Sequence, residues 1–190
     1  MSASSARSRR GHGTVTRILH WATVALVLVV LPAGIAMTGE GFRDVSGALY
    51  VTHKGGGVAL FVLLTLRLIW RALTPAPEPL PDTVEPLERR LASWTHAALY
   101  TLLAVLTLGG YARTVTGGFP VEALDALGVP PLLPEMPNLA IALSVLHSFV
   151  GYLFVAVVAL HLGAVARHAW VLRDSVPGRM WPPIAPRGDR

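Results

Sequence analysis

The sequence predicts an all-α protein, a transmembrane four-helix bundle with both termini in the cytoplasm. The first observation is a set of four apolar segments, each about as long as the ~20 residues that a helix needs to cross a bilayer. They run from about Arg17 to Met37, Leu49 to Trp70, Ser93 to Tyr111 and Leu139 to Ala166. The second is composition, since 53% of the 190 residues are hydrophobic and 14% are charged, against about 25% charged in soluble domains. None of the segments alternates with the two-residue period of a membrane β-strand.

The placement of basic residues predicts the orientation. They gather before the first segment, between the second and third, and after the fourth, whereas the other two connections are more acidic than basic. Since cytoplasmic loops are enriched in lysine and arginine, the termini and the middle connection are expected in the cytoplasm. We expect a cytoplasmic arm (residues 1–15), a four-helix domain (residues 16–172) and a cytoplasmic tail (residues 173–190). The net charge is +5, but the basic residues flank the membrane segments. They form no separate basic domain of the kind that binds nucleic acid.

The first segment opens with TRILHW, which places Arg17, His20 and Trp21 at its cytoplasmic end. Pro32 and Gly34 lie in its outer half, where a kink is tolerated if neighbouring helices pack around it. The segment is longer than the core of a signal peptide and is not followed by a clear small-residue cleavage site. We therefore expect a retained membrane anchor.

The second segment begins YVTHKGGGVALF, with His53 at its outer end. Each glycine costs a helix about 1 kcal/mol relative to alanine, so the run Gly55–Gly57 needs a reason. Small residues allow either close packing of another helix or a flat cofactor against the backbone near Gly56. Arg67 follows His53 by fourteen residues and shares its face at cytoplasmic depth, which favours an anionic partner, whereas Arg71 suits a snorkelling membrane anchor.

The proline-rich stretch from Thr74 to Pro86 is expected to be an extended cytoplasmic linker. The third helix is expected to start at about Ser93, with His96 near its cytoplasmic end. The connection from Ala112 to Asn138 is long and apolar. It is expected either to lie on the membrane surface or to cap the bundle.

The fourth segment carries His147 and His161, which are fourteen residues apart. On a helix this is close to four turns, so both rings share a face about 21 Å apart along the axis. The topology then pairs histidines by depth: His53 with His147 towards the outside, and His20 with His161 towards the cytoplasm. Four ionisable residues inside apolar segments at two matched depths indicate ligation and not isolated structural roles.

Two neutral imidazoles from different helices suit the axial positions of b-type haem. No aspartate or glutamate lies within the four segments, which disfavours zinc, non-haem iron and proton-relay sites. The absence of cysteine excludes disulfides, iron–sulfur clusters and covalently attached haem.

These residues resemble the bacterial cytochrome b561 family, whose members are four-helix di-haem membrane cytochromes. The resemblance covers nearly the whole chain and is carried by RILHW, YVTHKGGG, LRLIWR, the proline-rich linker and LHSFVGYLFVAVVALH in that order. It implies that His20, His53, His147 and His161 are the axial iron ligands of two haem b groups. It further implies an inner-membrane location, quinone as the electron partner and, in some members, superoxide oxidation coupled to ubiquinone reduction.

Four further expectations concern residues around these sites. His96 shares the level of His20 and competes with it as a ligand. Arg67 and Arg17 are expected to pair with a propionate of the inner haem, Arg17 because it precedes His20 by three residues. Lys54 is expected to steer an anionic reactant such as superoxide to the outer haem, or else to anchor the helix at the headgroups. His12 and His168 are expected at or beyond the helix ends, in contact with solvent.

Three function classes follow. The first is a redox enzyme that passes electrons between a small donor, with superoxide as one candidate, and the quinone pool. The second is a cytochrome b subunit that relays electrons between quinone and a partner dehydrogenase or hydrogenase. The third is a haem-free metal or ion transporter, which the missing carboxylates disfavour.

Overall fold

The computed structural model describes residues 12–75 and 84–182, and within these ranges it contains helices and no strand. Its four long helices are long and apolar enough to cross a membrane. They are α1 (Thr14–Ala36), α2 (Ser46–Leu73), α3 (Pro86–Thr116) and α5 (Pro137–Ala166). The predicted fold class, a transmembrane four-helix bundle, is therefore confirmed.

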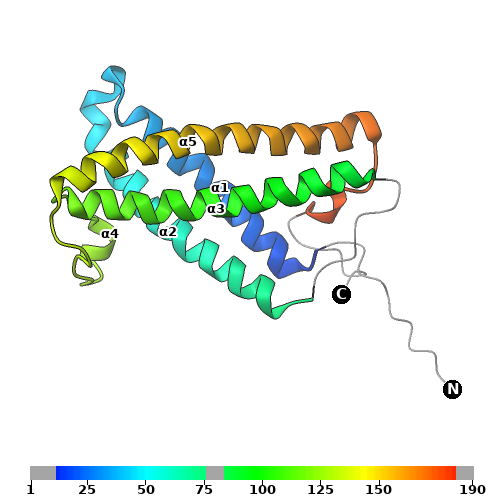
Figure 1. Ribbon diagram of the computed structural model, residues 1–190, viewed down its shortest axis with the longest axis horizontal. Helices are drawn as coiled ribbons and strands as arrows, with labels where there is room; N and C mark the ends of the chain where they lie inside the picture. Colours follow the sequence, from blue (N-terminus) through cyan, green and yellow to red (C-terminus); the bar gives the residue numbers. More distant parts are fainter. Residues whose placement is uncertain (1–11, 76–83, 183–190) are drawn as a thin grey trace.

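The helices form two hairpins (Figure 1). α1 packs along α2, α3 packs along α5, and α2 also contacts α3. Side chains from all four helices meet in one buried cluster that we call the central core: Val30, Leu60, Leu64, Leu103 and Phe154. On each helix the core residues lie within the membrane segment, with candidate site residues (histidine, glycine or arginine) on either side. The core therefore separates two levels of such residues, one towards each end of the bundle.

The helices extend beyond the apolar segments. α3 begins at Pro86 and not at the expected Ser93, because proline at the first helical position needs no N–H partner and its φ already suits a helix. The predicted extended linker falls largely on residues 76–83, outside the described residues. After α5 the chain continues as a π-helix (Arg167–Leu172) and turns at Arg173, whose φ is 52°.

The connection between α3 and α5 caps the bundle, which was one of the two expected arrangements. We call this end of the bundle outer and the opposite end inner, as the charge distribution predicts. It contains the short helix α4 (Glu122–Asp125), which contacts α2. Val121 is buried, and Lys54 Nζ of α2 donates to the carbonyl oxygen of Pro120 at 2.7 Å and to Glu122 Oε1 at 2.6 Å. The lysine therefore ties this connection to the outer end of α2.

This ion pair predicts a pH dependence of the outer connection. The hydrogen bond from Lys54 lowers the pKa of Glu122, so its stabilisation is complete above the ordinary glutamate pKa and is lost as pH falls through the lowered value. Glu122 is 39% exposed, so the effect on stability is expected to be small and salt-sensitive. Hydrogen exchange of residues 121–126 should accelerate on acidification, over and above the intrinsic pH dependence, and Glu122→Gln should remove that excess.

The last described residues return across the inner end of the bundle. We call Arg173–Pro182 the C-terminal strap; it includes the 3-10 turn η3 (Pro177–Arg179) and lies beside the start of α1 (Figure 1). At its beginning His168 Nδ1 lies 2.6 Å from Asp174 Oδ2. His168 is thus paired and largely buried, so the expected contact with solvent is wrong.

His12 also lies against protein. Its N–H donates to the carbonyl oxygen of Arg179 at 3.1 Å. Burial, together with the positive charges of Arg179 and Arg17, lowers the pKa of His12 to about 4. The expectation of a solvated imidazole is wrong here too, because the strap packs over this part of the chain.

Candidate functional site

The outer pair consists of His53 on α2 and His147 on α5. Their ring centroids are 6.0 Å apart and their planes are at 87°. His53 Nδ1 lies 2.9 Å from the carbonyl oxygen of Val30 on α1. A hydrogen bond donated from Nδ1 fixes the ring and leaves the Nε2 lone pair free, the arrangement usual for histidine ligands of metals. The Nδ1 atom of His147 is buried without a well-formed hydrogen bond among the described residues.

Each outer histidine packs against a glycine of its neighbouring helix. A Cβ added to Gly34 of α1 would lie 2.6 Å from His53 Cε1, and one added to Gly110 of α3 would lie 3.0 Å from His147 Cε1. Only a glycine leaves the His53 ring room to reach the carbonyl oxygen of Val30. The two glycines therefore act as seats for the two rings.

Gly34→Ala is expected to displace the His53 ring and to perturb the outer site alone. The added methyl group cannot fit at 2.6 Å, so either the ring or α1 must move. Gly47→Ala is the matched control, because Gly47 is exposed in the first turn of α2 and a Cβ there meets nothing within 4 Å. Redox difference spectra of the two variants should differ in the outer component only; equal spectra would show that the glycine is not a seat.

Three histidines lie at the inner level, and two of them are in contact. His96 of α3 and His161 of α5 have ring centroids 5.4 Å apart at 69°, while the His20 ring lies 5.6 Å from Trp21. His20 Nδ1 is 3.5 Å from Arg67 Nη2. The structure brings His161 against His96 and His20 against Arg67. The pairing of His20 with His161 stays a prediction, with His96 as the competing ligand.

Arg67 reaches into the inner level between three helices. Its Nη1 donates to Thr23 Oγ1 of α1 at 3.2 Å, and its guanidinium carbon lies 5.1 Å from the ring centroid of Tyr100 on α3. This placement keeps a positive charge beside His20. The expected contact with a haem propionate stays a prediction.

Arg17 and Gly56 have protein partners. The Arg17 side chain is buried, with Nε donating to the carbonyl oxygen of His12 at 2.7 Å and Nη1 to that of Pro182 at 3.0 Å. A Cβ added to Gly56 would collide with Val30 Cγ2. Close packing of α1 on α2 is therefore a sufficient reason for Gly56, and its role at a cofactor stays a prediction.

The outer pair fits a metal-centred planar group. Two metal–imidazole bonds of about 2 Å would set the ligating nitrogens about 4 Å apart, with the ring centroids further back. A centroid separation of 6.0 Å is close to that requirement. In the described ranges no group of three or more His, Cys, Asp or Glu residues could hold a metal ion. Paired imidazoles with glycine seats suit haem b better than a small metal ion held by protein ligands alone.

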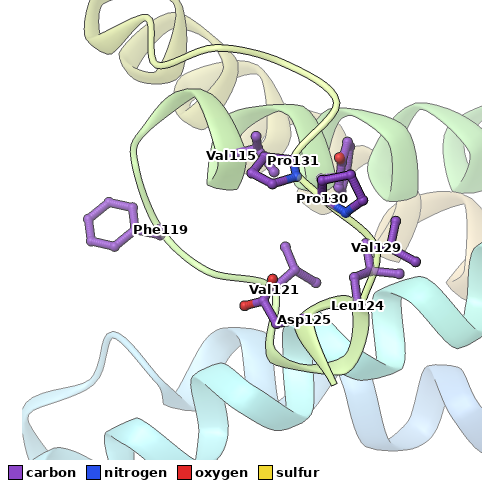
Figure 2. A pocket seen from close by; sticks show the side chains of 9 residues that line it. Val115, Phe119, Val121, Leu124, Asp125, Val129, Pro130 and Pro131 are labelled. Atoms are coloured by element: carbon purple, nitrogen blue, oxygen red, sulfur yellow. The ribbon is translucent and has the colours of Figure 1, made fainter. Parts of the chain in front are cut away.

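The hollows at the outer connection do not resemble a cofactor site. The pocket in Figure 2 lies between the end of α3 and the loop that follows it, among Val115, Val121 and Pro131. Its volume of about 30 Å³ is far below the roughly 300–1,000 Å³ of typical ligand pockets. A larger groove beside it is lined by apolar and proline side chains and by the carboxylate of Glu135. A negative charge there does not favour an anionic reactant.

Sequence reasoning missed several neighbours of the histidines. Arg113 lies in the last turn of α3, at the same end of the bundle as the outer histidines. Arg113 lies just beyond the third apolar segment and was already recognisable as one of the few cations on the outer side. Tyr100 is four residues after His96 and hence on the same helix face, which was a further signal. The seats at Gly34 and Gly110 have no local signal, because they depend on a ring from another helix.

Known proteins are similar to this chain over most of its length. A family profile described as prokaryotic cytochrome b561 matches residues 11–183. The chain is 27% identical over 172 residues to "Cytochrome b561 homolog 2" of Escherichia coli (strain K12), covering 89% of this chain and 90% of that protein. It is also 27% identical over 166 residues to "Probable superoxide oxidase CybB" of Yersinia pestis, covering 86% and 92%. The chain belongs to the prokaryotic cytochrome b561 family and is a multi-pass bacterial membrane protein of electron transport that binds haem b.

Proposed function

We propose that this chain is a di-haem cytochrome of the inner membrane that passes electrons from a small donor on the outer side to quinone in the membrane. The observation that carries the proposal is the contact of His53 with His147 at one level and of His96 with His161 at the other, where His20 lies beside Arg67. The central core between the two levels is apolar, so electrons can tunnel across it whereas ions find no polar side chain there. We place residues 1–15 and 173–190 in the cytoplasm on the charge distribution.

Haem b, when bound, accepts and releases single electrons. His53 would ligate through Nε2 while the carbonyl oxygen of Val30 holds its orientation. His147 would hold the same group from α5. At the inner level His161 would ligate together with His20, and Arg67 would hold a positive charge beside the site.

Superoxide is the donor that we propose, by analogy with the relative named as a probable superoxide oxidase. An anion needs a positive potential at the outer end. Lys54 does not supply it freely, because it is 15% exposed and bonded to Glu122. We propose Arg113, in the last turn of α3, as the source of that potential. The contacts of Lys54 with Pro120 and Glu122 favour a structural role for it, and its expected role in steering stays a prediction.

The test combines haem analysis with a reduction assay. Purified wild-type protein should contain two haem b by pyridine haemochrome, and enzymatically generated superoxide should reduce them and then added ubiquinone. Reduction should slow as ionic strength rises and in Arg113→Gln, whose haem spectra should be unchanged. The superoxide proposal would be falsified if protein with both haems showed no reduction by superoxide.

A chain that instead takes electrons only from a co-purifying dehydrogenase or hydrogenase would be a relay subunit. In that outcome the haem content and the spectra stay as proposed, and only the donor changes.

A further inference from the structure

One indole links the C-terminal strap to the inner histidine of α1. Trp21 Nε1 donates to the carbonyl oxygen of Met180 at 3.0 Å, and its ring meets the Trp181 ring edge-to-face at 5.4 Å. The His20 ring meets the same indole at 5.6 Å and 77°. The Trp21 ring therefore contacts two residues of the strap and the imidazole of His20.

Arg17 fastens the strap to the first turns of α1. Its side chain is 2% exposed, and it donates to the carbonyl oxygens of His12 and Pro182, residues 170 positions apart in the chain. Burying a guanidinium costs free energy unless its N–H groups donate hydrogen bonds. The two hydrogen bonds therefore stabilise both the buried position of Arg17 and the position of the two carbonyl groups. A hydrogen bond from the backbone N–H of His12 to the carbonyl oxygen of Arg179 also joins the strap to the residues before α1.

We propose that the C-terminal strap positions His20 for the inner cofactor site, with Trp21 transmitting the contact and Arg17 acting as the latch. The inference rests on the proposed role of His20 as a ligand. The position of His20 matters because His96 already lies against His161. A loosely held His20 would therefore compete poorly with His96 for the place of the second ligand. Arg17 and Trp21 are positioning residues that act on the site through other groups.

The rival explanation is that Arg17 meets a propionate directly, as its place three residues before His20 suggested. The two explanations make different predictions for Trp181, whose ring contacts Trp21. If the strap positions His20, Trp181→Ala and Arg17→Met should have the same effect, and the double variant should be no worse than either. If Arg17 contacts the cofactor, only Arg17→Met should matter.

The experiment measures the reactivity of His20 in the purified full-length protein. Diethyl pyrocarbonate labelling of His20, quantified by mass spectrometry, should rise about tenfold in Arg17→Met and in Trp181→Ala, the change expected when a hydrogen bond or contact of this strength is lost. Trp170→Ala is the matched control, because Trp170 lies at the same end and is 76% exposed. Unchanged labelling in both strap variants would overturn the proposal. If Arg17→Met fails to fold, Trp181→Ala decides alone.

Electron paramagnetic resonance of the oxidised haems supplies the second readout. The low-spin signal of a bis-histidine haem depends on the angle between its two imidazole planes, so the inner signal should shift in both strap variants and the outer signal should not. A shift in Arg17→Met alone would establish the rival explanation. Should His20→Ala retain both haems, the proposed ligand role fails, and labelling still decides whether the strap holds His20.

Discussion

Alanine at His53 or His147 is expected to abolish the outer haem and leave the inner one. The two rings face each other at 6.0 Å, so removal of either leaves one imidazole where two axial ligands are needed. Pyridine haemochrome analysis should fall from about two haems per chain to about one, and the redox difference spectrum should lose one component. His20→Ala and His161→Ala should remove the other component.

His12→Ala is the control, because this histidine lies outside both levels and its backbone makes the bond to Arg179. Its haem content should equal that of the wild type. Loss of one and the same spectral component from His20→Ala and His53→Ala would contradict the pairing by depth. A wild-type chain with one haem or none would contradict the di-haem proposal itself. Retention of the inner haem in His20→Ala, together with its loss in His96→Ala, would assign the ligand to His96.

Loss of the Arg67 charge is expected to lower the midpoint potential of the inner haem. Reduction adds an electron, so a nearby positive charge stabilises the reduced form. A unit charge about 8 Å away at an effective dielectric constant of about 20 contributes about 2 kcal/mol, which is about 90 mV for a one-electron couple. Redox titration of Arg67→Leu should show a decrease of this order in one component and none in the other.

Two variants sharpen this measurement. Arg67→Lys keeps the charge and should restore most of the potential, although it loses the contact with the Tyr100 ring. Arg71→Leu removes a charge from the exposed end of the same helix and should have a much smaller effect because solvent screens it. Unchanged potentials in Arg67→Leu would make this residue an anchor of the helix and no part of the inner site.

The fold was predictable because a membrane span is a local property of the sequence. Apolar length alone identifies each of the four helices, and the even number of spans returns the chain to its starting side. The fourteen-residue spacing of His147 and His161 was equally readable, because helix periodicity turns spacing into a shared face. The ends of α3 were less predictable, since residues 86–92 are helical but too polar to register as a membrane segment.

The neighbours of the histidines were not predictable, because they depend on which helices pack together. Gly34 looked like a kink beside Pro32, but it is the seat of a ring that comes from α2. Lys54 looked like a free cation until the connection after α3 folded back and paired it with Glu122. Arg17 shares a helix face with His20, yet its partners come from both ends of the described chain.

The central core has a consequence for energy conversion. Its five buried side chains, Val30, Leu60, Leu64, Leu103 and Phe154, are hydrocarbon throughout, and they occupy the depth between the outer and inner histidines. Such a layer blocks hydrated ions and protons, but an electron can tunnel through it. An electron crossing it alone moves charge against or along the transmembrane voltage, which is worth about 2.3 kcal/mol per 100 mV for a full crossing. The rate and extent of electron exchange between the two levels should therefore depend on membrane polarisation in sealed vesicles.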